Sequence, residues 1–321
     1  MRSISRGKKL LALVFSLALI ASACGSDDDG GSGDTTTTEA SGGTTAPEEG
    51  NSGGELIDLG TFVGDPPEHI DPALNVTLDA YQVVNALYDG LTEIDSTDPE
   101  NPETKPLVAE SFEPNDDATV WTFKIKEGLK FSNGEPVLPS SFSSAWERAS
   151  DPDFAGDYSY LMNFIEGGQE KLDGDADTLA GVEADDEAMT LTVTLSEPYA
   201  NFATVAGFQL FMPMPKAVEE LKDQADWENG LMIGNGPFML ETERTEQEIV
   251  VVKNPEWAGD IFGNTEAKLD KITFRVSADP DSAYNAFEAG EGDTANVPPG
   301  RVTEADEYYA TTLDVSILGT Y

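Results

Sequence analysis

Histidine and cysteine are almost absent from this sequence of 321 residues, which contains one of each, His69 and Cys24. General acid–base and nucleophilic catalysis rely most often on such side chains, and the Gly-x-Ser-x-Gly motif of many hydrolases is also missing. A lone imidazole is a weak metal ligand, and a lone cysteine has no disulfide partner. The sequence therefore predicts neither an enzyme nor a cofactor or metal site.

Basic residues are also scarce, because 18 lysines and arginines stand against 61 aspartates and glutamates, giving a formal net charge of −43. Such a charge repels phosphate backbones and anionic membrane surfaces, which excludes nucleic-acid binding. A cleft for a cationic ligand would concentrate the acidic residues, whereas here they are spread along the chain. We interpret them as a solvated surface of the kind suited to a saline habitat.

The start of the chain has the pattern of an export signal. Arg2, Arg6, Lys8 and Lys9 precede an apolar run at residues 10–20, which is short for a membrane span. Small residues, Ala21 to Ala23, then precede Cys24. This pattern resembles a bacterial lipoprotein signal, although Ala21 replaces the usual leucine. We expect a signal peptide at residues 1–23 and a lipid on Cys24; the alternative is an ordinary cleavage site beside an incidental cysteine.

Residues 24–54 are rich in Gly, Ser, Thr, Asp and Glu and contain almost no apolar side chain. Such a segment cannot bury enough apolar surface to fold. We therefore expect a flexible tether between the lipid and the folded part.

A strand is the clearest folded element in the sequence. Trp121, Phe123 and Ile125 alternate with polar residues, and this period of two predicts a strand with one buried face. Turn-forming residues bound it on both sides, so residues 109–137 are expected to form a hairpin unit. Met189 to Leu195 show the same alternation and predict a second such strand.

Helical spacing and β-rich runs predict further elements. We expect strands at residues 55–63, 249–252 and 269–274, a helix at residues 79–93 with Asp79 as its N-cap, a helix capped by Ser140 or Ser141, and a helix carrying Ala283 and Phe287.

Several motifs resemble those of one family. The chain reads A-E-S-F-E at residues 109–113, W-T-F-K-I-K-E-G-L-K-F-S-N-G-E-P-V at 121–137, L-Y-D-G-L at 87–91 and G-N-G-P-F at 234–238. They closely resemble segments of the extracytoplasmic solute-binding proteins, family 5, which serve peptide, oligopeptide and nickel ABC importers. The resemblance, strongest to the oligopeptide-binding branch, implies an α/β fold of the two-lobed, class II periplasmic-binding-protein type.

The resemblance also implies a division of the chain. The first lobe would comprise residues 55–94 and 216–321, with an inserted mixed α+β subdomain at residues 95–215. Family members cross into a second lobe where this sequence stops, so we expect that lobe to be missing from a truncated sequence.

The resemblance places a ligand site on the first lobe. Val76, Thr77 and Leu78 match family positions that line the cleft and pair with the backbone of an extended peptide. Asn235 and Trp257 match further positions near the ligand. Each of these residues could instead have a purely structural role. Val76 and Leu78 would then pack within the loop, Asn235 would be a turn residue, and Trp257 would belong to the core.

The expected function is that of a monomeric, lipid-anchored receptor on the outer face of the cell membrane or in the periplasm. It would capture peptides and pass them to the permease and ATPase of an ABC importer. Two alternatives remain open: an envelope-anchored interaction or signalling lipoprotein on the same fold, and a receptor for a non-peptide solute such as nickel or a sugar.

The excess of negative charge predicts that salt stabilises the protein, because ions screen the repulsion between acidic residues. Screening acts beyond about 10 Å at 0.1 M ionic strength and at shorter range in more salt. We expect the melting temperature to rise from dilute buffer to molar chloride. A flat or falling melting temperature would contradict this prediction.

Overall fold

The computed structural model describes residues 53–98, 100–154, 156–219, 221, 227–228, 230, 232–261 and 263–309. The predicted signal peptide, the acylation site Cys24 and nearly all of the tether lie outside these residues. No helix in the described part of the chain is both long enough and apolar enough to span a membrane.

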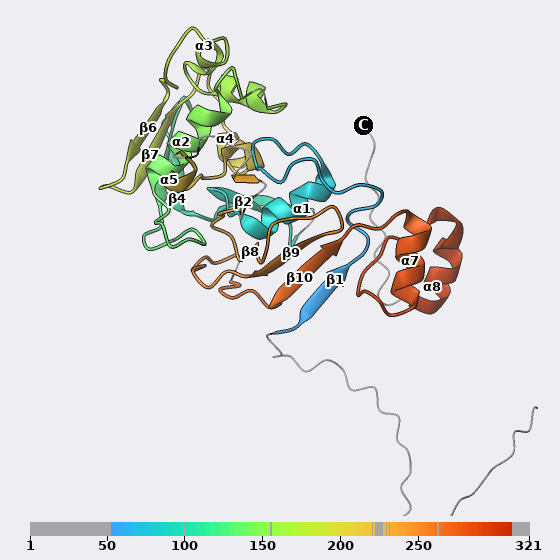
Figure 1. Cartoon of the computed structure of the whole chain (residues 1–321). Coiled ribbons are helices and arrows are strands. Elements are labelled where there is room, and N and C mark those ends of the chain that lie inside the picture. Colours follow the sequence, from blue (N-terminus) through green and yellow to red (C-terminus); the bar gives the residue numbers. More distant parts are fainter. Residues whose placement is uncertain are drawn as a thin grey trace, which may run out of the picture. The chain divides into compact units, whose positions relative to one another are not determined.

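One four-stranded sheet combines the first strand of the described chain with its last three strands. It contains β1 (Glu55–Asp58), β10 (Lys271–Arg275), β9 (Glu248–Lys253) and β8 (Phe238–Leu240), in that order. β1 runs parallel to β10, and the other neighbours are antiparallel. The helix α1 (Leu78–Leu87) packs against β8 and buries Val83, Val84 and Leu87 (Figure 1).

A second four-stranded sheet has the order β4 (Ala109–Pro114), β5 (Val120–Ile125), β7 (Thr190–Thr194) and β6 (Val182–Asp185), and every neighbouring pair is antiparallel. Trp121, Phe123 and Ile125 are at most 4% exposed, which confirms the predicted buried face. The helix α2 (Pro139–Ala149) packs on β6 and β7 (Figure 1) and buries Phe142 and Trp146.

Shorter elements make up the rest of the described secondary structure. They are the hairpin of β2 (Thr92–Asp95) and β3 (Glu103–Pro106), η1 (Ser159–Phe164), α3 (Gly168–Leu172), α4 (Phe202–Val205), η2 (Gln209–Phe211), α5 (Lys216–Glu219), α7 (Pro280–Glu288), η3 (Pro299–Arg301) and α8 (Val302–Tyr309). The division into a first lobe and an inserted subdomain, at residues 94 and 215, stays a prediction.

The predicted N-cap of α1 is wrong. The Thr77 hydroxyl, not the Asp79 carboxylate, accepts the N–H of Ala80 at 3.2 Å and caps the helix. Asp79 lies inside the first turn, where its charge complements the helix dipole. α2 also begins earlier than predicted, at Pro139. The fixed φ angle of proline suits the first position of a helix.

The predicted C-terminal limit of α1 is wrong as well, because the helix ends at Leu87 rather than near residue 93. The Leu87 carbonyl accepts the N–H of Gly236 at 2.8 Å, and a Cβ on Gly234 would lie only 1.9 Å from the same oxygen. Two glycines from a distant segment therefore end the helix. Strand β1 stops at Asp58 rather than residue 63, since the Asp58 carboxylate accepts the N–H groups of Gly60 and Thr61 in a turn.

Candidate functional site

The loop before α1 presents apolar side chains to solvent. Val76 is 45% exposed and Leu78 is 68% exposed, whereas Val83, Val84 and Leu87 of α1 are buried. Within the described chain, the N–H and C=O of Val76 and the N–H of Leu78 make no hydrogen bond. The loop thus offers both free backbone groups and apolar contacts.

A buried amide pair fixes the conformation of this loop. Asn75 and Gln209 are each 2% exposed, and the Asn75 amide donates to Gln209 Oε1 at 3.0 Å while the Gln209 amide donates to the Asn75 carbonyl. Asn75 also accepts the N–H of Thr77 at 2.9 Å and donates to its carbonyl at 3.1 Å. Asn75 and Gln209 were not predicted from the sequence, because no local motif marks a pair separated by 134 residues.

Aromatic rings lie next to the Gln209 anchor. Phe208 packs edge-on against Tyr158, with ring centroids 5.1 Å apart and an interplanar angle of 87°. Phe208 also borders a small hollow of about 130 Å³ that it shares with Tyr81 of α1 and with Ile94, which is 48% exposed. The amide pair therefore links the loop to the segment that carries Phe208, a partly exposed ring packed against Tyr158.

A buried ion pair holds the base of the loop. The Arg148 guanidinium of α2 donates to both oxygens of the Asp71 carboxylate, and the two side chains are 7% and 1% exposed. The guanidinium also lies over the rings of Phe154 and Trp227, at 4.3 and 5.3 Å from their centroids. The segment that carries the loop is thereby fixed to α2.

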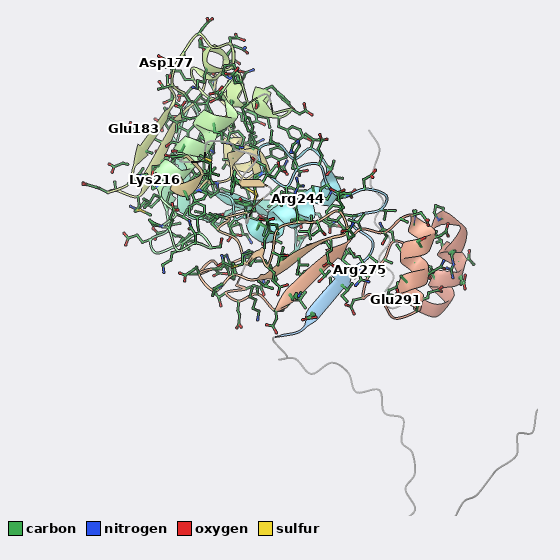
Figure 2. All side chains as sticks on the ribbon, in the orientation of Figure 1. Asp177, Glu183, Lys216, Arg244, Arg275 and Glu291 are labelled. Atoms are coloured by element: carbon green, nitrogen blue, oxygen red, sulfur yellow. The ribbon has the colours of Figure 1, made fainter. Side chains whose placement is uncertain are left out.

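Glu228 provides a second anchor for the same segment. Its carboxylate accepts the N–H of Ile70 at 2.6 Å, and its Oε2 lies 2.9 Å from Nδ1 of His69. Arg244, labelled in Figure 2, donates to the carbonyls of Pro67 and Glu68. His69, the only histidine, is thus part of the support for the loop.

Two hollows flank the loop. Leu74 lines one of about 490 Å³, together with His69, Arg148 and Phe154. Leu78 lines the other, of about 730 Å³, together with Gln82, Ile272 and Phe274. Hollows of this size suit small ligands or side chains of a bound peptide.

The five predicted ligand residues fall into two groups at opposite ends of α1, which at 10 residues is about 15 Å long. Val76, Thr77 and Leu78 precede the helix. Asn235 and Trp257 lie beyond its other end, where both contact Asp89. The structure does not bring the two groups together.

Asn235 and Trp257 each have partners inside the protein. The Asn235 amide accepts the Asp89 N–H at 3.2 Å and donates to its carbonyl at 2.9 Å, and Asn235 is 4% exposed. Trp257 Nε1 donates to the Asp89 carboxylate at 2.7 Å. These contacts give both residues a structural role, and ligand contact by either one stays a prediction.

Asp89 is a buried carboxyl group, only 4% exposed. Burial raises its pKa to about 7; the hydrogen bond from Trp257 opposes the rise, the charge of Glu93 adds to it, and Lys126 lowers it. The group therefore changes charge near neutral pH. Among the described residues, no group of three or more histidine, cysteine or acidic side chains is arranged to hold a metal ion.

A family model describes most of this chain. Residues 103–319 match the model of the bacterial extracellular solute-binding proteins, family 5. The dipeptide-binding protein DppE of Bacillus subtilis (strain 168) is 31% identical over 236 residues, which are 72% of this chain and 41% of that protein.

Solved structures show the same fold. The Escherichia coli murein tripeptide binding protein MppA has a TM-score of 0.69 and 30% identity, covering 79% of this chain and 48% of that one. Listeria monocytogenes OppA bound to peptide has a TM-score of 0.68 and 27% identity, covering 81% and 49%. The chain spans less than half the length of these proteins. The similarity confirms the class II periplasmic-binding-protein fold predicted from the sequence.

The buried Asp89 predicts that stability depends on pH. Because the pKa of about 7 in the folded chain lies above the usual value of 3.8, the folded state binds the proton more tightly. The free energy of unfolding should therefore fall as pH rises from about 4 to 8, by at most about 4 kcal/mol from this group. Asp89→Asn keeps an oxygen acceptor for Trp257 but cannot ionise, so this fall should disappear.

The measurement is urea unfolding at pH 5 and pH 8 at constant ionic strength. The control is Asp157→Asn, which removes one charge from an exposed position and should retain the parent's pH dependence. An Asp89→Asn variant with the parent's pH dependence would show that the carboxyl stays ionised in the folded protein.

Proposed function

Because this chain belongs to the bacterial extracellular solute-binding proteins of family 5, we propose that it captures peptides outside the cytoplasm for an ABC importer. The observation that carries the choice of ligand is the loop at residues 76–78, which combines unpaired backbone groups with exposed apolar side chains. Every peptide unit offers the same donor and acceptor, so such a loop can hold extended peptides of varied sequence. The relatives named above, which bind dipeptides, tripeptides or peptides, support this choice.

Within the site, the roles of the three loop residues differ. Val76 and Leu78 supply the free backbone groups and the apolar contacts. The N–H of Thr77 is already bonded to Asn75, so Thr77 serves by holding the loop and capping α1. Peptide side chains would enter the hollows on either side of the loop. Asn235 and Trp257 would contact the ligand only if their hydrogen bonds to Asp89 were broken.

The proposed function includes a second step, delivery to the permease and ATPase of the importer. Delivery requires the receptor to stay near the membrane, and the lipid on Cys24 with its flexible tether would keep it there. A tether of about 30 residues spans roughly 30 Å, enough to let the folded part reach a permease on the same membrane.

The first test changes the loop. Val76→Asp with Leu78→Asp places two carboxylates against the proposed ligand without disturbing the core, because both residues are exposed. We expect the dissociation constant for a defined tripeptide pool, measured by calorimetry, to rise at least about tenfold, or about 1.4 kcal/mol. The matched control is Val302→Asp, at a residue that is 46% exposed on α8, and it should bind as the parent does.

Binding is compared in this chain and in any longer product of the gene. A second lobe that closes over the ligand would raise the affinity. If the double variant is folded and binds the pool as tightly as the parent and the control, the loop is not the ligand site.

The second test concerns the anchor. Cys24→Ala removes the proposed acylation site, so we expect the protein to move from the membrane fraction to the soluble fraction and peptide uptake by the cells to fall. A serine replacement elsewhere in the tether, Gly42→Ser, should leave both unchanged. Retention of Cys24→Ala in the membrane fraction would show that the anchor lies elsewhere.

A further inference from the structure

A hollow of about 520 Å³ lies between η1 and the segment that follows β7. Tyr160, Asn163 and Phe164 line it on one side, and Glu197, Pro198 and Tyr199 line it on the other. None of these residues belongs to the loop at residues 76–78 or to its supports. The volume is typical of sites for small molecules.

Aromatic rings form much of this hollow. Phe164 and Tyr199 stack with their centroids 5.0 Å apart and an interplanar angle of 24°. Tyr160 also lines the hollow and is 59% exposed, so its ring is open to a ligand. The negative faces of aromatic rings attract cations, most strongly where the cation is partly removed from water.

The two sides of the hollow are held together by hydrogen bonds. The Ser196 hydroxyl donates to the carbonyls of Asn163 and Ile165, at 3.0 and 2.9 Å, and the Ser196 N–H donates to the Phe164 carbonyl at 2.9 Å. Trp121 Nε1 donates to the Tyr199 carbonyl at 3.3 Å. A ligand would therefore meet a hollow that is already formed and would lose little free energy to ordering it.

The charge of the hollow is negative. Among the described residues, Glu197 is the one charged residue that lines it, and no described lysine or arginine lies within 4.0 Å of its carboxylate. The net charge of −43 adds a general attraction for cations and repels anions. An uncharged ligand would gain nothing from the carboxylate.

We propose that this hollow binds a small organic cation with an apolar shell, of the quaternary ammonium class. Its methyl groups would contact the rings of Tyr160, Phe164 and Tyr199, and its charge would lie beside Glu197. A methylated ammonium fits better than a metal ion or a primary amine, because it has no N–H groups or tightly held water to satisfy and its surface is apolar. This site does not depend on the proposed peptide-binding function.

The test compares choline with 3,3-dimethylbutan-1-ol, which has the same shape and no charge. Calorimetry at low ionic strength should give saturable choline binding at millimolar concentration or below, and the alcohol should bind at least about tenfold more weakly. Tyr160→Leu and Glu197→Gln should each weaken choline binding about fivefold or more. Both residues are exposed, so both variants should fold.

The matched control is Glu183→Gln, an exposed acid on β6 of the same subdomain, labelled in Figure 2, which should leave choline binding unchanged. Three results would overturn the proposal: no saturable choline binding at millimolar concentration, equal binding of the uncharged alcohol, or equal loss of binding in the Glu183→Gln control. The last would indicate attraction by the overall charge rather than by this hollow.

Discussion

The buried ion pair between Asp71 and Arg148 is the constraint on which the candidate ligand loop depends. Both side chains are almost fully removed from water, so neither charge can be left without the other. Removing one partner of such a pair costs about 3–5 kcal/mol, because the remaining charge stays buried and uncompensated. The pair joins the segment before α1 to α2, and thus fixes the loop relative to the second sheet. The rings of Phe154 and Trp227 cover the guanidinium and add cation–π contacts to the ion pair.

The amide pair of Asn75 and Gln209 adds a second constraint, on the conformation of the loop itself. An ion pair sets the position of the segment, whereas the four hydrogen bonds between the Asn75 amide and Gln209 or Thr77 set the backbone conformation of the loop. A loop fixed in this way loses little entropy when a ligand binds, which improves affinity. Its exposed apolar residues are consequently held in place by hydrogen bonds from buried side chains.

Acidic residues far outnumber basic ones, and this excess affects both the ion pairs of the fold and the choice of ligand. Several of the few cations are paired, as in the contacts of Lys271 with Glu241 at 2.7 Å and of Arg301 with Glu288 at 2.8 Å. Many of the remaining carboxylates face solvent, where they repel one another. Where such a carboxylate lies beside aromatic rings, as Glu197 does, the same excess of charge favours a cationic ligand.

The sequence by itself determined the elements whose signal is local. The alternation of Trp121, Phe123 and Ile125 predicted a buried strand face, because side chains on a strand alternate between two faces whatever lies elsewhere in the chain. The motifs at residues 87–91, 121–137 and 234–238 were sufficient to predict the family and therefore the fold. The absence of paired cysteines and of histidine clusters was likewise readable from composition.

Tertiary structure alone decided where those elements end and which residues support the site. Helix α1 stops at Leu87 because Gly234 and Gly236 approach its last carbonyl. No sequence pattern near Leu87 predicts this approach. The partners Asn75 and Gln209, and likewise Asp71 and Arg148, are brought together from distant segments, and buried polar groups reveal their pairing only once the chain has folded around them. Local periodicity reports which face of an element is buried, whereas the identity of the partner across a contact is a property of the fold.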